Sequence, residues 1–185
     1  MMTQPAAEIL TLLDQIAGAD RGRQGAAFQT LCTATETRVG WADAVWGDLV
    51  ALLDHANNRT RAIAGQMLSR LAPFADPGTV AGTLPRLVAA TRDAQFVTGR
   101  HILQSLARVA DACDPVPTLL VDLLAARFRD CAAEKNASLI RFDIQTVLRA
   151  VHDRTDDDGI RLRALDLAML EADVKYRKKY IGCWR

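Results

Sequence analysis

The chain has 185 residues and a mass of 20.2 kDa, with 23 Lys and Arg against 22 Asp and Glu, so net charge alone points to no class of partner. Ala and Leu together account for 54 residues, an apolar content that excludes a disordered or collagen-like chain. This length predicts one domain, or one short array of repeats, with a hydrophobic core of its own.

Apolar residues recur at helical spacing along the whole chain, whereas the alternation typical of strands is nearly absent. Gly, Pro and short polar turns divide the chain into segments of normal helix length. They predict an all-α chain with nine helices, near residues 5–17, 23–37, 41–54, 59–72, 79–92, 95–111, 116–131, 136–152 and 159–178. Short connections favour antiparallel packing of neighbouring helices.

The predicted helices repeat in pairs with a period of about 37 to 41 residues. An offset of 38 places Leu68 on Leu106, and an offset of 41 places Leu106 on Val147. A helix pair cannot bury its apolar face alone, so such units must stack. The period therefore predicts a single α-solenoid domain over residues 1–185, with units near 5–37, 41–72, 79–111 and 116–152 and a C-terminal helix at 159–178.

In each of two units, an aspartate is followed by an arginine at the same spacing. In addition, a proline lies within a first helix. The residues are Asp54 with Arg61, Asp93 with Arg100, and Pro85. In these features residues 41–152 resemble the HEAT-repeat family, and residues 5–37 resemble it more loosely. The resemblance implies a right-handed α–α superhelix (HEAT/armadillo-like) of about four helix pairs plus the C-terminal helix. It also implies that such Asp and Arg side chains pair along the stack.

The sequence carries no motif for a metal, a cofactor or covalent catalysis. The run Asp156–Asp158 before Gly159 is not an EF-hand loop, because Arg154 and Leu165 stand at two ligand positions. These acids are instead predicted to cap the following helix. The three histidines have no metal-ligand spacing, and neither glycine-rich nucleotide fingerprint occurs. We therefore expect a non-enzymatic protein with no cofactor and no metal site.

The start of the chain and its cysteines predict a cytoplasmic protein. The first residues lack the basic and apolar regions of a secretory signal, and no stretch is apolar enough to span a membrane. The cysteines form no C-x-x-C pair and are predicted to be buried free thiols, namely Cys32, Cys113, Cys131 and Cys183.

A polar stripe recurs on the second helix of the repeat units. It comprises Gln66, Arg70, Arg100, Gln104, Arg108, Arg141, Gln145 and Arg149. Residues four apart share one helix face, so helices 95–111 and 136–152 each carry Arg, Gln and Arg in one line. A core does not tolerate unpaired Arg, so the stripe is expected to face solvent and to contact a partner.

The charges divide unevenly between the two kinds of helix. The four second helices contain eight Arg and three acids, a net charge of +5, and the four first helices contain four Arg and seven acids, a net charge of −3. Second helices usually line the concave surface of such stacks, and a basic concave surface concentrates anionic partners. The alternative is a solvated stripe copied by repeat duplication, with some Arg forming ion pairs between repeats.

The C-terminal segment is a second basic feature. Residues 175–185 hold five basic and no acidic side chains. Cations in the last turn of the predicted helix 159–178 would complement its dipole. The run is also typical of a tail that binds nucleic acid or an acidic patch.

The leading prediction is a non-enzymatic binding or scaffold protein that holds an acidic peptide or protein on the second-helix face through Arg donors. The alternative is a nucleic-acid-binding protein, since some HEAT-like solenoids are glycosylases for alkylated purines in DNA. Such an enzyme needs aromatic side chains and a carboxylate beside the base. The aromatic residues of this face are expected to lie in the core and Asp143 is the lone mid-helix acid near the stripe, so the face departs from that requirement; the aromatic residues are Phe28, Phe96 and Phe142. A third option is a subunit whose open end docks on another protein. The sequence predicts no membrane contact and leaves the oligomeric state open.

Overall fold

A computed structural model describes residues 7–185, which fold into ten α-helices and three 3₁₀ helices with no β-strand, confirming the all-α prediction. The helices are α1 (Ala7–Ala17), α2 (Arg21–Ala34), α3 (Ala42–Leu52), α4 (Asn58–Leu71), α5 (Pro77–Ala89), α6 (Phe96–Ser105), α7 (Val116–Asp130), α8 (Ala137–Thr155), α9 (Asp158–Met169) and α10 (Val174–Gly182). The 3₁₀ helices are η1 (Ala90–Arg92), η2 (Leu106–Asp111) and η3 (Cys131–Ala133). The first two residues of the predicted helix 5–17 lie outside the described residues.

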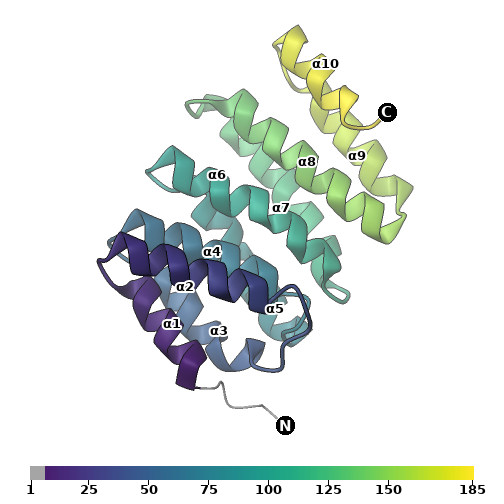
Figure 1. The fold of residues 1–185 in the computed structure, drawn as a ribbon. Helices are drawn as coiled ribbons and strands as arrows, with labels where there is room; N and C mark the ends of the chain where they lie inside the picture. The colour runs from purple at the N-terminus through teal and green to yellow at the C-terminus, as the bar shows by residue number, and fades with distance from the viewer. Residues whose placement is uncertain (1–6) are drawn as a thin grey trace.

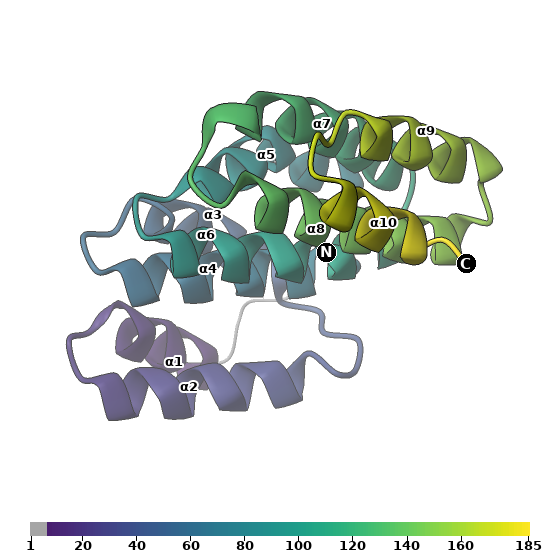
Figure 2. The same cartoon turned by 90° about the horizontal axis from the view of Figure 1, so that it is seen from above.

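The helices follow one another as pairs arranged in two layers (Figure 1). In one layer α2, α4, α6, α8 and α10 contact one another in series, and in the other α5 contacts α7 and α7 contacts α9. Figure 2 shows the two layers from above, with α3, α5, α7 and α9 on one side and the even-numbered helices on the other. We call the outer surface of the even-numbered layer the second-helix face.

Asp and Asn side chains in the short turns start many of these helices. Asp20 caps α2 by accepting hydrogen bonds from two backbone N–H groups, and Asn57 caps α4 by accepting one from the N–H of Arg59. Asp157 accepts from the N–H of Gly159 and caps α9, which confirms the capping prediction for the Asp156–Asp158 run. These turns place the N-termini of successive second helices along one edge of the stack (Figure 1).

Small residues allow the second helices to approach one another closely. A Cβ atom on Gly65 of α4 would lie 2.7 Å from Cγ1 of Ile102 in α6. A Cβ atom on Gly99 of α6 would lie 2.5 Å from the carbonyl oxygen of Thr91, so only Gly fits there. Leu and Ala fill the remaining space between the layers, and the core runs without interruption from α1 to Trp184. This continuity is the packing that stacked helix pairs require.

The prediction of one C-terminal helix over residues 159–178 is wrong. The chain leaves the helix after Met169 and starts α10 at Val174, where Asp173 accepts hydrogen bonds from two N–H groups. The described residues therefore form five helix pairs rather than four pairs and a single helix. The basic run begins in the first turn of α10 and only Lys179 lies in the last turn, so the explanation from the helix C-terminal dipole applies to Lys179 alone.

The prediction of buried thiols holds for only part of the cysteine set. Cys32 and Cys131 are buried free thiols, and burial raises the pKa of both. Cys183 is half-buried, whereas Cys113 is exposed in the turn between η2 and α7. Along the described residues, the helices are all too short or too polar to cross a membrane.

Candidate partner-binding face

Four of the eight predicted partner-binding residues surround a hollow on the second-helix face. This central hollow of about 450 Å³ lies between α4, η2 and α8 and is lined by Gln66, Arg70, Gln104 and Arg108. The amide of Gln66 donates to the carbonyl oxygen of Ala62 on its own helix, at 3.0 Å. The sequence offsets therefore bring this part of the stripe together as predicted.

Acidic side chains partly neutralise the central hollow. Glu36, after the end of α2, holds Arg70 at 2.9 Å and Arg108 at 3.6 Å through the same carboxylate oxygen. The hydrogen bond from Arg70 and the charge of Arg108 lower the pKa of Glu36. Arg154 pairs with Asp111 at 2.7 Å. Three arginines thus face two carboxylates, which leaves one excess positive charge.

Arg100 is held by an acid of the next repeat instead of facing solvent freely. Its Nε and Nη2 donate to the two carboxylate oxygens of Asp143 in α8, at 2.6 and 3.0 Å. Gln104 donates to the same carboxylate at 3.1 Å. Asp143 is buried, so these bonds replace the water that the charge lost. The acid considered for base chemistry is therefore occupied by structural partners.

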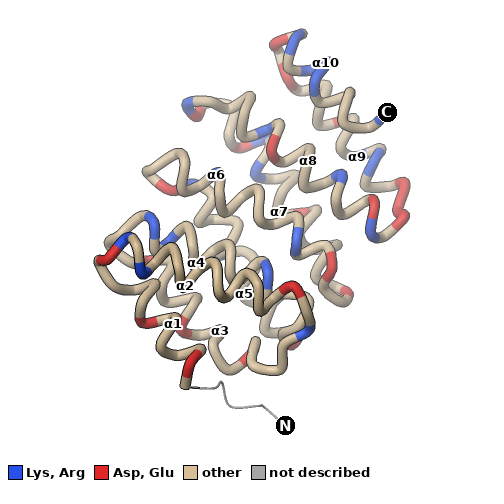
Figure 3. Tube along the Cα trace, in the orientation of Figure 1, with Lys and Arg blue, Asp and Glu red and all other residues tan. Residues whose placement is uncertain are grey.

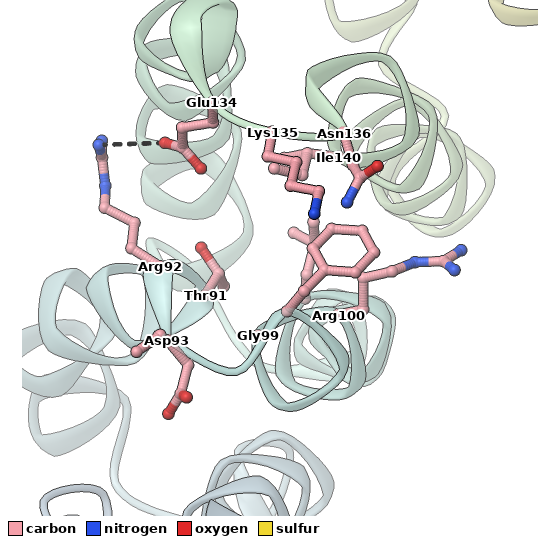
Figure 4. A pocket seen from close by; sticks show the side chains of 12 residues that line it. Thr91, Arg92, Asp93, Gly99, Arg100, Glu134, Lys135, Asn136 and Ile140 are labelled. Carbon is pink, nitrogen blue, oxygen red and sulfur yellow. Dashed lines mark ion pairs between the residues drawn. The ribbon is translucent and has the colours of Figure 1, made fainter.

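A smaller pocket lies at the edge where α6 and α8 begin (Figure 4). It measures about 260 Å³, and Lys135 and Asn136 point toward its centre while the side chain of Arg100 leads away. Arg92 lies 3.6 Å from Glu134, which is also bound by the buried Arg127 at 2.7 Å. Most charged side chains around this smaller pocket are therefore paired within the protein.

The prediction that the whole stripe faces solvent is wrong for Arg141 and Gln145. Both are buried. Arg141 lies 3.2 Å from Glu171 and donates to the carbonyl oxygen of Phe128. Gln145 donates to the carbonyl oxygen of Ala164 at 2.9 Å and accepts from the Trp184 indole at 2.7 Å. The pair α9–α10 covers these side chains and supplies partners for them.

Arg149 joins α8 to the C-terminal segment. Its Nε donates to Asp153 at 2.6 Å, and its Nη1 donates to the carbonyl oxygen of Cys183 at 2.9 Å. The guanidinium also lies over the Trp184 ring, 5.9 Å from the centroid. The C-terminal third of the stripe therefore binds the chain's own last helix pair.

The expected pairing of Asp54 with Arg61 and of Asp93 with Arg100 does not occur. Arg61 instead makes a two-pronged contact with Asp93 of the following unit, at 2.6 and 2.9 Å. Asp54 pairs with Arg86, also across units. The ion pairs run along the stack because an arginine on one second helix lies beside the turn of the next unit. Ion pairs between repeats, the alternative reading of the arginines, are therefore present.

The stripe left out two arginines that line a second hollow. This N-terminal hollow of about 380 Å³ lies between α2, α4 and α6, with Arg21 and Arg59 beside the apolar side chains of Phe28, Ile63 and Val97. Among residues 7–185, neither guanidinium has a carboxylate oxygen within 4.0 Å. The signal in the sequence was Gly25, a glycine inside a helix, which leaves room for Arg59.

The two hollows adjoin each other, because both are lined by Gln66 and His101. We call the two hollows together the second-helix groove. The charge count by helix overstated the net positive charge of the second-helix face. Asp93 and Glu171 lie outside the second helices and neutralise arginines on them. The excess charge concentrates at the N-terminal hollow, and Figure 3 shows Lys and Arg gathered where α2 and α4 begin.

Comparisons with known families and with curated proteins find no relative of this chain. No known protein family matches the chain. No curated protein is significantly similar to it in sequence. The groove and its charges are therefore the observations that bear on function.

Proposed function

We propose that this chain is a non-enzymatic binding protein, a HEAT-like right-handed α-solenoid that holds an acidic segment of a protein partner in the second-helix groove. The observation that carries the proposal is the excess of arginine over carboxylate along the groove, greatest at Arg21 and Arg59. Guanidinium groups bind carboxylates through paired hydrogen bonds.

Three features support the HEAT-like assignment within this proposal. Helix pairs follow one another in two layers, and arginine–aspartate pairs such as Arg61 with Asp93 link successive units. Pro85 lies inside α5, a first helix, as in the family that the sequence resembles. The parallel second helices then provide a surface long enough for an extended peptide.

The charge distribution favours a peptide over nucleic acid. A phosphate backbone along the groove would pass the carboxylates of Glu36 and Asp111, which would repel it. A peptide needs an acidic group at only one or two points. The aromatic side chains on this face, Phe28, Phe96 and Phe142, pack against the core, as the sequence predicts.

The proposal is tested with a fluorescein-labelled peptide of alternating Glu and Leu, whose binding is followed by fluorescence polarisation. The double variant Arg21→Glu, Arg59→Glu should weaken binding about tenfold or more, because charge-assisted hydrogen bonds each contribute about 1.5–3 kcal/mol. The matched control is Arg129→Glu, an exposed arginine on α7 in the other layer, which should bind as the parent does.

Equal binding by the double variant and the control would contradict the proposal. A peptide of alternating Lys and Leu should not bind, which excludes a purely apolar contact. Duplex DNA serves as the last arm of the experiment. Tight DNA binding that falls steeply with salt, together with no peptide binding, would support the nucleic-acid alternative instead.

A further inference from the structure

We infer that the N-terminal hollow is a phosphate-recognition subsite, which takes the phosphate of a phosphorylated serine or threonine in the partner together with an adjacent apolar side chain. This inference rests on the proposed function, because it assumes that a peptide occupies the second-helix groove. It specifies the chemical group that the peptide presents to Arg21 and Arg59.

Gly25 gives the Arg59 side chain a defined place. A Cβ atom at position 25 would lie 3.0 Å from Nη2 of Arg59, so the guanidinium uses the space that the missing side chain leaves. Arg21 lies one helical turn before Gly25 and Phe28 lies about one turn after it, on the same side of α2. The guanidinium of Arg59 is therefore held against α2 on the side that carries Arg21.

Within the part of the chain that the structure describes, Arg21 and Arg59 lack counter-charges, unlike the other arginines that line the groove. Every other arginine of α4, α6, η2 and α8 has a carboxylate oxygen within 4.0 Å. Two like charges that line one hollow repel each other, and a glycine inside a helix is less stable there than alanine. An anion that bridges Arg21 and Arg59 would remove the repulsion.

A phosphate monoester fits this hollow better than a carboxylate does. It carries a charge of about −1.5 to −2 at neutral pH and three acceptor oxygens, which match two guanidinium groups with several donors each. One carboxylate carries a single charge and would leave half of the positive charge uncompensated. The N-termini of α2, α4 and α6 lie along this edge (Figure 1). N–H groups there are already bound by Asp20, Asn57 and Asp93, so the two guanidinium groups supply the donors for the anion.

The apolar part of the hollow selects what lies beside the phosphate. Phe28, Ala62 and Ile63 line it, and Val97 at the start of α6 leaves 63% of its surface exposed. An apolar side chain next to the phosphorylated residue would cover these groups and release their water. A phosphopeptide with an apolar neighbour is thus the ligand that uses both parts of the hollow.

The test compares two short labelled peptides that differ at one residue, one with phosphoserine followed by leucine and the other with glutamate followed by leucine. The parent protein should bind the phosphoserine peptide about tenfold more tightly, the effect of roughly one additional charge-assisted hydrogen bond. Arg21→Gln and Arg59→Gln should each remove most of this preference. Gly25→Ala should also reduce it, because the new methyl group displaces the Arg59 guanidinium, while alanine favours the helix and preserves folding.

Arg70→Gln is the control, since Arg70 lies in the same groove but is paired with Glu36, and it should keep the preference. Equal affinity for the two peptides, with binding still lost in the Arg21→Glu, Arg59→Glu variant, would overturn the phosphate assignment and leave the proposed function standing. Binding of neither peptide would overturn both. A phosphate preference that persists in Arg59→Gln and Gly25→Ala would place the subsite elsewhere and also overturn this inference.

Discussion

The segment α6–η2 and the helix α8 carry the same Arg, Gln, Arg line at the same spacing, yet the two lines have different environments. Gln104 of α6 and Arg108 of η2 are exposed beside the central hollow. In α8, Arg141 and Gln145 are buried beneath the last helix pair. A repeated residue is therefore exposed or buried depending on whether the next unit packs over it.

The difference follows from where the next unit places its polar groups. Glu171, in the link between α9 and α10, reaches Arg141, and the Trp184 indole reaches Gln145. Each buried donor or acceptor then has a partner, which makes its burial tolerable. On α6, Asp143 of the next unit accepts from Arg100 and Gln104, and Gln104 stays exposed.

The largest expected difference in unfolding free energy is between variants of Arg141 and Arg108. Arg141→Ala should lower the free energy of unfolding by about 3–5 kcal/mol, because it leaves the buried Glu171 without its charge partner. Arg108→Ala should cost no more than about 1 kcal/mol, as for other exposed ion pairs. Urea unfolding measures both. Equal losses in the two variants would contradict the division between covered and open arginines.

Substitutions of the two corresponding glutamines, Gln145 and Gln104, should also differ in the stability they cost, but by less. Gln145→Ala leaves the Trp184 indole N–H unpaired in the core and removes the hydrogen bond to the Ala164 carbonyl, and should cost about 2–4 kcal/mol in unfolding free energy. Gln104→Ala removes one exposed donor and should cost about 1 kcal/mol or less. A shift in the urea midpoint for Gln145→Ala no larger than that of Gln104→Ala would show that the last pair does not cover α8.

Glu171 should make the covered region sensitive to acid. Burial raises its pKa, but hydrogen bonds from the Asp173 N–H, Tyr180 and Arg141 outweigh burial and hold the pKa below its usual value. A carboxylate with a lowered folded pKa adds stability above its unfolded pKa and loses it as the pH falls. Urea midpoints should therefore decline from about pH 5 downward. The Glu171→Gln variant should decline less steeply, and an unchanged slope would contradict this origin.

The smallest expected effect is a change in peptide affinity at the central hollow, beside Arg70 and Arg108. Glu36→Gln removes the carboxylate that Arg70 and Arg108 share, and so frees both for a partner. The affinity for the acidic Glu–Leu peptide should rise by about threefold to tenfold at low salt and by less at high salt. Fluorescence polarisation at two salt concentrations measures the change. Weaker binding would indicate that Glu36 organises the arginines for the partner rather than competing with it.

Local patterns predicted most of the fold. Apolar spacing located the helices, the period of their pairs indicated a stack, and the Asp156–Asp158 run was correctly assigned to a helix cap. The break after Met169 was missed because its cause is not local. Asp173 caps α10, but Glu171 is fixed by Arg141, which lies 30 residues earlier in the chain.

The site was less predictable because burial depends on distant partners. The stripe correctly grouped Gln66, Arg70, Gln104 and Arg108 around one hollow. It gave no sign that Trp184, 39 residues away, would cover Gln145. It also omitted Arg59, whose position depends on Gly25 of the neighbouring helix, a contact that no spacing within one helix reveals.

The most direct test is the dissociation constant of the Glu–Leu peptide for Arg59→Gln, measured beside Arg129→Gln as the control. The uncompensated Arg59 predicts binding about tenfold weaker in Arg59→Gln, with an unchanged melting temperature, because the substitution removes a charge-assisted contact with the partner but no ion pair within the fold. The control should match the parent in both. An unchanged dissociation constant, or a melting temperature lowered as in Arg141→Ala, would contradict the role of Arg59 as a free partner-binding group.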